Sequence, residues 1–209
     1  MDKYRSHFTS QEYENYTKHG INILTDYYAQ YQSEWLIPRQ FEIEYNIPAT
    51  EYQGVPISGK LDRINIYDDH ISVTDYKTGK YDPKKLKGPA GGVDDIGGDY
   101  WRQIIFYRLL LDGDKRHNWV MNKGIMDFVE KDGDDKFRKV EFTVEPFETE
   151  IVGQQLKETY SSIKNHIFTP GCGDEKCQWC NFVARNMPVG ITAGDEDPED
   201  VHELIQEVI

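Results

Sequence analysis

The spacing of apolar residues predicts three helices. Tyrosines and leucines recur at mixed three- and four-residue spacings over residues 10–36, which indicates a long first helix. Thr9 and Glu12 stand at the spacing of a capping box at its start, and Pro38 ends it. The same periodicity predicts a strongly apolar helix over 99–112 and an amphipathic helix over 147–166.

Alternation of apolar and polar residues predicts strands between these helices. The strands are expected over 41–47, 53–59, 60–67, 70–77, 123–131 and 136–145. The order of helix, antiparallel strands, helix, strands and helix predicts one α/β domain with a mixed sheet. The Gly-, Lys- and Pro-rich segment 79–98 has no periodicity, and a loop of this length is typical of a functional segment.

Two consecutive predicted strands are joined by Asp68 and Asp69, which predicts a hairpin with a two-residue loop. In that register Asp62 lies opposite Asp75, on the same face as Lys77, with the two aspartate Cβ atoms about 5 Å apart. Such carboxylates repel each other and are desolvated by apolar neighbours, and Mg²⁺ or Mn²⁺ would relieve both effects. This pattern predicts a metal-assisted phosphodiesterase. The alternative is a surface hairpin with an ordinary cross-strand ion pair, and a one-residue shift would separate the aspartates.

Three short motifs stand in order along this part of the chain. They are GKLDRI at 59–64, VTDYKTG at 73–79 and QIIFY at 103–107. Together they resemble the central motifs of RecB-type nucleases in the PD-(D/E)XK superfamily, and most resemble the C-terminal nuclease domain of bacterial UvrD/Rep-type helicases, as in AddAB and RecBCD systems. The resemblance implies a PD-(D/E)XK fold, in which helices flank a mixed central sheet. It also implies Mg²⁺- or Mn²⁺-dependent hydrolysis of DNA.

The resemblance also implies roles for individual residues. Metal binding falls to Asp62, Asp75 and the main-chain carbonyl of Tyr76, and catalysis to Lys77. Gln103 and Tyr107 border the site and DNA, and their four-residue spacing puts both on one helix face. In the cell, the family implies an exonuclease that acts beside a helicase motor, in the same chain or complex, during recombination or double-strand-break repair.

The chain departs from the family pattern in two places. Leu61 stands where the superfamily name has proline. The metal-binding histidine that such nucleases carry in an N-terminal helix has no good counterpart, because His19 is followed by glycine. A chain excised from a longer protein would explain this absence. Glu44, on the strand before the hairpin, is a further candidate for the site, with a solvated strand acid as the alternative.

A second chemical signal is formed by three cysteines near the C-terminus. Cys172, Cys177 and Cys180 have the spacing of ligands to zinc or to an iron–sulfur cluster. His166 would complete a Cys₃His Zn²⁺ site. Related nucleases hold a [4Fe–4S] cluster with one additional upstream cysteine, which this chain lacks, and Asn186 stands about where the last cysteine of the family's trio falls. Three interpretations stay open: a cluster completed by a region outside the chain, a zinc site, or reduced thiols without a ligand.

Charge does not exclude nucleic acid as a partner. The chain has 24 Lys and Arg against 37 Asp and Glu, a formal net charge of −13. Much of this excess lies in the acidic segment 195–209, whereas 77–87 is rich in lysine. Basic side chains beside the predicted site are candidate phosphate contacts, with a solvated loop and simple surface charges as alternatives; they are Lys80, Lys84, Lys85, Lys87 and Arg102. Tyr100 and Trp101 are candidates for base stacking, although an apolar helix more often buries such rings.

The predicted organisation is one nuclease domain followed by a tail. The domain covers 1–187, with its N-terminal helix at 10–36, core at 39–145, C-terminal helix at 147–166 and cysteine segment at 167–187; an acidic tail covers 188–209. No apolar run is long enough for a membrane helix, and no signal-peptide core is visible. We therefore expect a cytoplasmic bacterial protein without membrane partners. A Walker A motif is absent, so any ATPase would lie outside this chain.

Overall fold

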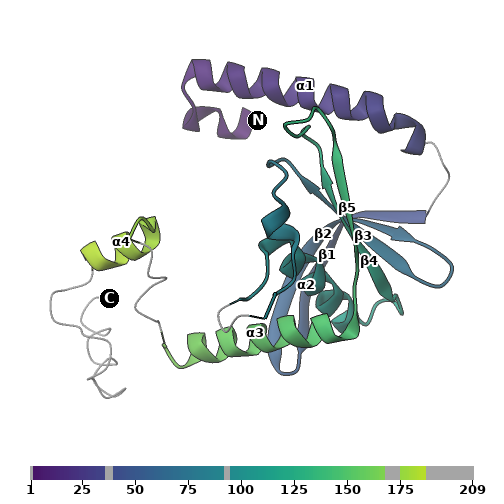
Figure 1. The fold of residues 1–209 in the computed structure, drawn as a ribbon, viewed down its shortest axis with the longest axis vertical. Coiled ribbons are helices and arrows are strands. Elements are labelled where there is room, and N and C mark those ends of the chain that lie inside the picture. Colours follow the sequence, from purple (N-terminus) through teal and green to yellow (C-terminus); the bar gives the residue numbers. More distant parts are fainter. Residues whose placement is uncertain (1, 36–39, 92–94, 168–174, 187–209) are drawn as a thin grey trace. The chain divides into compact units, whose positions relative to one another are not determined.

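The computed structural model describes residues 2–35, 40–91, 95–167 and 175–186. Contacts divide the chain into two units, 1–158 and 159–209. The elements shown in Figure 1 are η1 (Asp2–His7), α1 (Ser10–Trp35), β1 (Gln40–Tyr52), β2 (Val55–Ile66), β3 (Ile71–Lys77), η2 (Pro83–Leu86), α2 (Asp99–Gly113), β4 (Met121–Phe128), β5 (Arg138–Thr143), α3 (Pro146–Lys164) and α4 (Gln178–Asn186). The predicted acidic tail and the domain boundary at 187 lie outside the described residues.

The five strands form one mixed sheet in the order β1-β2-β3-β4-β5. β3 and β4 are parallel, and the other three pairs are antiparallel. Parallel neighbours need a long crossover connection, and the segment that contains α2 supplies it. The predicted α/β class with a mixed sheet flanked by helices is confirmed.

The hairpin of β2 and β3 has the predicted register. Arg63 pairs with Thr74 and Ile66 with Ile71, and the main-chain N–H of Tyr67 donates to the His70 carbonyl at 2.9 Å across the turn. Asp62 and Asp75 stand one residue beyond the last pair of this register, Arg63 and Thr74. The two-residue Asp68-Asp69 loop therefore brings together the strand segments that carry the two aspartates.

The sequence prediction divided β2 wrongly into two strands, 53–59 and 60–67. The structure has one continuous strand whose buried positions change phase between Leu61 and Ile64. On the neighbouring strand β1, Glu44 has a positive φ of 52° and lies between two regular pairs of β1 and β2. Gly59 ends the first of the two predicted strands, and in the structure a Cβ there would lie 2.5 Å from Leu110 Cδ1. This glycine therefore permits close packing of β2 on α2.

The apolar side of α2 forms the centre of the core. Ile104, Ile105 and Leu110 are fully buried. Trp101 is 3% exposed, and its indole N–H donates to Glu148 Oε1 on α3 at 2.8 Å. Burial of Trp101 was the favoured alternative for this ring, and it is confirmed. Because α2 is packed along its length, polar side chains on its sheet-facing side have fixed positions.

The long helix α1 is held more lightly. Its predicted capping box is confirmed, because the Thr9 N–H donates to Glu12 Oε2 at 2.9 Å and the Glu12 N–H donates to Thr9 Oγ1 at 3.3 Å. Among the described residues of α1 only Tyr27 is buried. Figure 1 shows α1 running across the hairpin of β4 and β5. No described helix is both long and apolar enough to cross a membrane.

Candidate active site

Three elements bring the predicted site residues together. β2 carries Asp62, β3 carries Asp75 and Lys77, and α2 carries Gln103 and Tyr107. Asp75 and Lys77 are two residues apart on β3 and so point to the same side of the sheet. That side is the one covered by α2, where Gln103 and Tyr107 stand one helical turn apart and face β3.

Asp75 lies at the centre of this cluster and is only 3% exposed. Its Oδ1 atom accepts from Tyr107 Oη at 2.6 Å and from Gln103 Nε2 at 2.9 Å. Burial, followed by the Asp75 carboxylate, raises the pKa of Tyr107 well above its usual value. Tyr107 therefore keeps its proton over the physiological range and acts as a fixed donor to the carboxylate.

Lys77 is the cation of the cluster, and its side chain is 18% exposed. Its Nζ atom lies 2.7 Å from Asp75 Oδ2 and donates to Gln103 Oε1 at 2.6 Å. The Gln103 amide thus accepts from Lys77 through oxygen and donates to Asp75 through nitrogen. One side chain on α2 sets the positions of both charged groups on β3.

Asp62 joins the cluster from β2. Its Oδ2 atom accepts from the main-chain N–H of Tyr76 at 2.9 Å, which fixes the half-buried carboxylate against β3. The charge of Asp62 contributes to the raised pKa of Tyr107, as does the charge of Asp75, so both carboxylates influence the same hydroxyl group. The Tyr76 ring points to the other face, where Arg63 Nη1 donates to its hydroxyl at 3.4 Å. Only the main chain of Tyr76 belongs to the cluster, and its carbonyl as a metal ligand stays a prediction.

The donor set fits a hard divalent cation. Asp75 Oδ2 is fully buried and accepts no well-aligned hydrogen bond from the described residues, although Lys77 stands beside it. Mg²⁺ is commonly held by one or two carboxylates, with waters and substrate phosphates completing its shell. Asp62 and Asp75 match that pattern. No cluster of three or more His, Cys, Asp or Glu side chains suited to a metal occurs within the described ranges.

Two further candidates from the sequence point elsewhere. His19 lies on α1 with Nε2 3.7 Å from Glu130 Oε1, and the structure does not group it with the two aspartates. The Glu44 side chain is 74% exposed and accepts from Lys60 Nζ at 2.7 Å. That hydrogen bond lowers the pKa of Glu44. The solvated alternative therefore describes Glu44 better than a role in the site.

The lysine-rich loop after β3 is more ordered than its sequence indicated. Residues 83–86 form the turn η2, whose start is capped by Asp82 Oδ1 accepting from the Lys84 N–H at 2.9 Å. A Cβ at Gly98 would lie 2.4 Å from the Lys85 carbonyl, so glycine lets the loop pack on the start of α2. Outside η2, the described residues of 79–91 and 95–98 have no helix or strand, so the predicted loop is confirmed there. Arg102 is engaged locally by Asp99 and by the Gly97 carbonyl, and its predicted phosphate contact stays a prediction.

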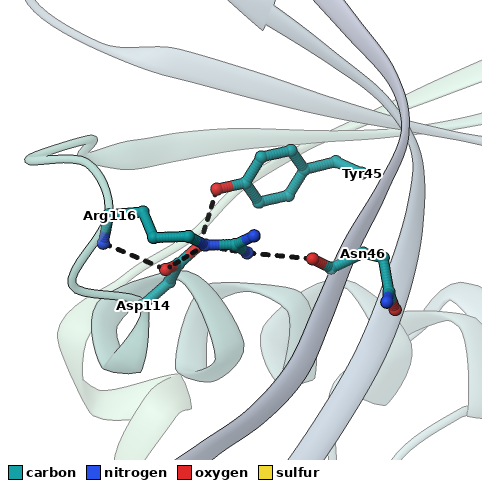
Figure 2. Close-up of polar contacts among 4 residues, drawn as sticks. All are labelled: Tyr45, Asn46, Asp114 and Arg116. Carbon is teal, nitrogen blue, oxygen red and sulfur yellow. Dashed lines mark hydrogen bonds and ion pairs between the residues drawn. The ribbon is translucent and has the colours of Figure 1, made fainter.

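A network that the sequence reasoning missed holds the far end of α2 (Figure 2). Asp114 is 9% exposed and accepts from Tyr45 Oη at 2.7 Å and from Arg116 Nε at 2.9 Å. Arg116 Nη2 also donates to the Asn46 carbonyl on β1 at 2.9 Å. Arg116 holds the pKa of Asp114 well below its usual range, and burial raises the pKa of Tyr45 to about 12. This anchor fixes α2 on β1 and thereby the helix that carries Gln103.

The cysteine segment belongs to the second unit. Cys172 lies outside the described residues, and Cys177 and Cys180 are half-buried around the start of α4. His166 follows the end of α3 in a left-handed conformation, with φ of 52°. The three interpretations of these cysteines therefore stay predictions.

The chain is similar to a family model and to solved structures. No curated protein matches the chain. A solved structure described as "Crystal structure of SSO0001" is similar over 73% of this chain and 62% of that chain, so the chain spans less than two thirds of its length; the sequence identity is 20% and the TM-score 0.40. A family model described as "PD-(D/E)XK nuclease superfamily" matches residues 3–185, from η1 to α4, and so includes β2, β3 and α2. The chain belongs to the PD-(D/E)XK nuclease superfamily.

Proposed function

We propose that this domain hydrolyses DNA phosphodiester bonds in a reaction that depends on Mg²⁺ or Mn²⁺. Membership of a superfamily whose members are usually nucleases supports the reaction class. The observation that carries the proposal is the single network of Asp75, Lys77 and Gln103, in which every polar contact is 2.9 Å or shorter. Tyr107 and Asp62 extend this network on either side.

Hydrolysis adds water across a phosphorus–oxygen ester bond. The water oxygen bonds to phosphorus, the ester oxygen leaves with one proton, and the other water proton passes to solvent. A bound divalent cation would supply Lewis acidity and a source of hydroxide at neutral pH. In this proposal Lys77 offsets negative charge that develops on the phosphate oxygens, and its hydrogen bond to Gln103 supports that position. Asp62 and Asp75 would hold the cation.

The proposal is tested by digestion of labelled single- and double-stranded DNA with Mg²⁺, Mn²⁺ or EDTA. Cleavage is expected with either metal and not with EDTA, and Lys77→Ala is expected to reduce it by about 10²-fold or more, because the charge opposite the phosphate is lost. Lys123→Ala is the matched control, since Lys123 is a strand lysine paired with Glu141 away from the cluster. Cleavage that survives EDTA or is unchanged in Lys77→Ala would contradict the proposal.

The cellular role follows from the same resemblance. We propose an exonuclease that processes DNA ends beside a helicase motor in recombination or double-strand-break repair. The alternative is a nuclease-like module that binds DNA or braces a helicase without cleaving, and the absence of the family's N-terminal histidine favours it. DNA binding without cleavage under both metals would support that alternative. Release of mononucleotides from labelled ends, against internal nicking of circular DNA, distinguishes exonuclease from endonuclease action.

A further inference from the structure

Tyr100, in the first turn of α2, touches two lysines from different parts of the chain. Lys77 Nζ lies 4.9 Å from the centroid of its ring, and Lys85 Nζ lies 5.3 Å from the same centroid. Both distances are within the range of cation–π attraction. One half-buried ring therefore links the cation of the candidate active site to the lysine-rich loop.

The Tyr100 ring packs against a residue of the core. Tyr100 meets Phe128 edge to face with centroids 5.8 Å apart, and Phe128 is fully buried at the end of β4. Its parallel partner in the sheet is Lys77. Tyr100 thus stands on the same part of the sheet as the active site, with its position set by the core.

The loop is also held at this point. The Lys85 carbonyl lies close to Gly98, which precedes Tyr100 by two residues in the sequence. The Gly98 N–H also donates to the Lys87 carbonyl at 2.8 Å. The backbone of the lysine loop is therefore fixed on the start of α2, while the Lys85 side chain is exposed.

The loop lysines carry uncompensated charge. In the described part of the chain, no carboxylate pairs with Lys80, Lys84, Lys85 or Lys87, whereas Lys60, Lys123 and Lys139 each pair with a glutamate. Because both Nζ atoms lie near the centroid of one ring, the Lys77 and Lys85 ammonium groups are at most about 10 Å apart. The spacing suits neighbouring phosphates of one strand.

We propose that Lys85 binds a phosphate adjacent to the scissile one, on the same strand, and that Tyr100 is the positioning residue that aligns Lys85 with Lys77. This inference rests on the proposed hydrolysis of DNA and defines the path of the strand into that site. The ligand is the sugar–phosphate backbone, read through its charge and not through its bases.

Binding is measured with a fluorescein-labelled oligothymidine in EDTA over a range of KCl concentrations, so that no cleavage is needed. Lys85→Gln is expected to reduce the slope of log affinity against log salt by about 0.7, the value for one phosphate contact on a single strand. Lys18→Gln, an exposed lysine on α1, is the matched control and is expected to leave the slope unchanged. Equal slopes for the two variants would overturn the proposal.

The role of Tyr100 is tested by coupling to Lys85. Tyr100→Phe keeps the ring and is expected to bind like the parent chain. Tyr100→Leu is expected to lower affinity as much as Lys85→Gln, and the double variant to lose no more than either single one. Additive losses would assign Tyr100 a separate, structural effect and refute its positioning role. Thermal denaturation of each variant checks that the fold is retained.

Kinetics separate this inference from the proposed function. With cleavable DNA, Lys85→Gln is expected to raise KM about fivefold with little change in kcat, because a uniform binding contact is removed. Tyr100→Leu is expected also to lower kcat, because Lys77 loses its contact with the ring. If the chain binds DNA as expected but never cleaves it, the proposed hydrolysis is refuted and the proposed contact of Lys85 with the strand is kept. If the chain cleaves DNA while Lys85→Gln behaves like Lys18→Gln, the contact of Lys85 is refuted and the proposed hydrolysis is kept.

Discussion

Two buried aspartates on neighbouring strands meet nearly the same chemical groups on opposite faces of the sheet. Asp75 on β3 is 3% exposed and Asp127 on β4 is 4% exposed. Each accepts from a tyrosine hydroxyl at 2.6 Å, Asp75 from Tyr107 and Asp127 from Tyr27. Asp127 pairs with Tyr76 across the parallel strands, so its side chain points away from the face that Asp75 occupies.

The two aspartates differ in their cations and in their second donors. Lys77 lies 2.7 Å from Asp75, but Lys139 lies 3.5 Å from Asp127 and is shared with Glu34 at 3.1 Å. Gln103 donates to Asp75 Oδ1, whereas in both aspartates one buried oxygen, Asp75 Oδ2 or Asp127 Oδ1, has no hydrogen bond in the described part of the chain. Burial therefore raises the pKa of Asp127. The two buried carboxylates therefore have different surroundings: a close lysine and a glutamine amide beside Asp75, and a more distant, shared lysine beside Asp127.

The largest expected difference between the two aspartates is in cleavage. Asp75→Asn removes the charge that would hold a cation and that pairs with Lys77, and DNA cleavage is expected to fall by about 10³-fold or more. Asp127→Asn changes the same atoms on the other face and is expected to leave the cleavage rate within about threefold. Initial rates on labelled DNA measure both. Similar losses of cleavage rate in the two variants would mean that both substitutions act through the stability of the fold, and that Asp75 has no separate role in the reaction.

A smaller difference is expected between the two tyrosines. Tyr107→Phe removes one donor to Asp75 but leaves Gln103, and kcat is expected to fall about tenfold, since a hydrogen bond to a charged group contributes about 1.5–3 kcal/mol. Tyr27→Phe is expected to keep kcat but to weaken the attachment of α1. Limited proteolysis within residues 10–35 checks the second effect. Faster proteolysis in Tyr107→Phe than in Tyr27→Phe would contradict this division.

The smallest expected effect is a pH dependence of stability. Because the pKa of Asp127 is raised on folding, the folded state binds more protons than the unfolded state above about pH 4, and this residue loses stabilising effect as pH rises toward its folded pKa. Asp127→Asn is expected to gain stability relative to the parent chain between pH 4 and pH 7, measured by urea denaturation at each pH. Asp68→Asn, in the exposed turn, is the control. A relative loss for Asp127→Asn over that interval would reverse the sign and refute the account.

The sequence was most informative where local rules decide the structure. The register of β2 on β3 follows from a two-residue turn, and the cap at Thr9 and Glu12 follows from their spacing; both predictions are confirmed. The motif residues from Asp62 to Tyr107 do come together in space, and their roles stay predictions. The superfamily is shown, whereas its RecB-like branch and helicase partner stay proposals.

Features that depend on distant packing could not be predicted in the same way. Asp127 is an ordinary strand residue in the sequence, and only the docking of Tyr27, a hundred positions away, makes it a buried acceptor. Asp114 and Arg116 have no distinguishing pattern in the sequence, and only the packing of β1 brings Tyr45 onto both of them. The continuity of β2 through Gly59 was not predicted, because this glycine permits a close approach to Leu110, which is a tertiary requirement.

The central position of β3 in the sheet has a consequence for the order in which parts of the molecule unfold. β3 is the central strand of the five, and its Asp75 is tied to the buried helix α2, so main-chain amides around the site should exchange with solvent only through global unfolding. α1, with Tyr27 as its single buried residue among those described, belongs to the least protected part. Hydrogen exchange should therefore show a candidate active site whose amides become exposed only when the whole domain unfolds, while α1, the longest of the described helices, detaches and returns many times.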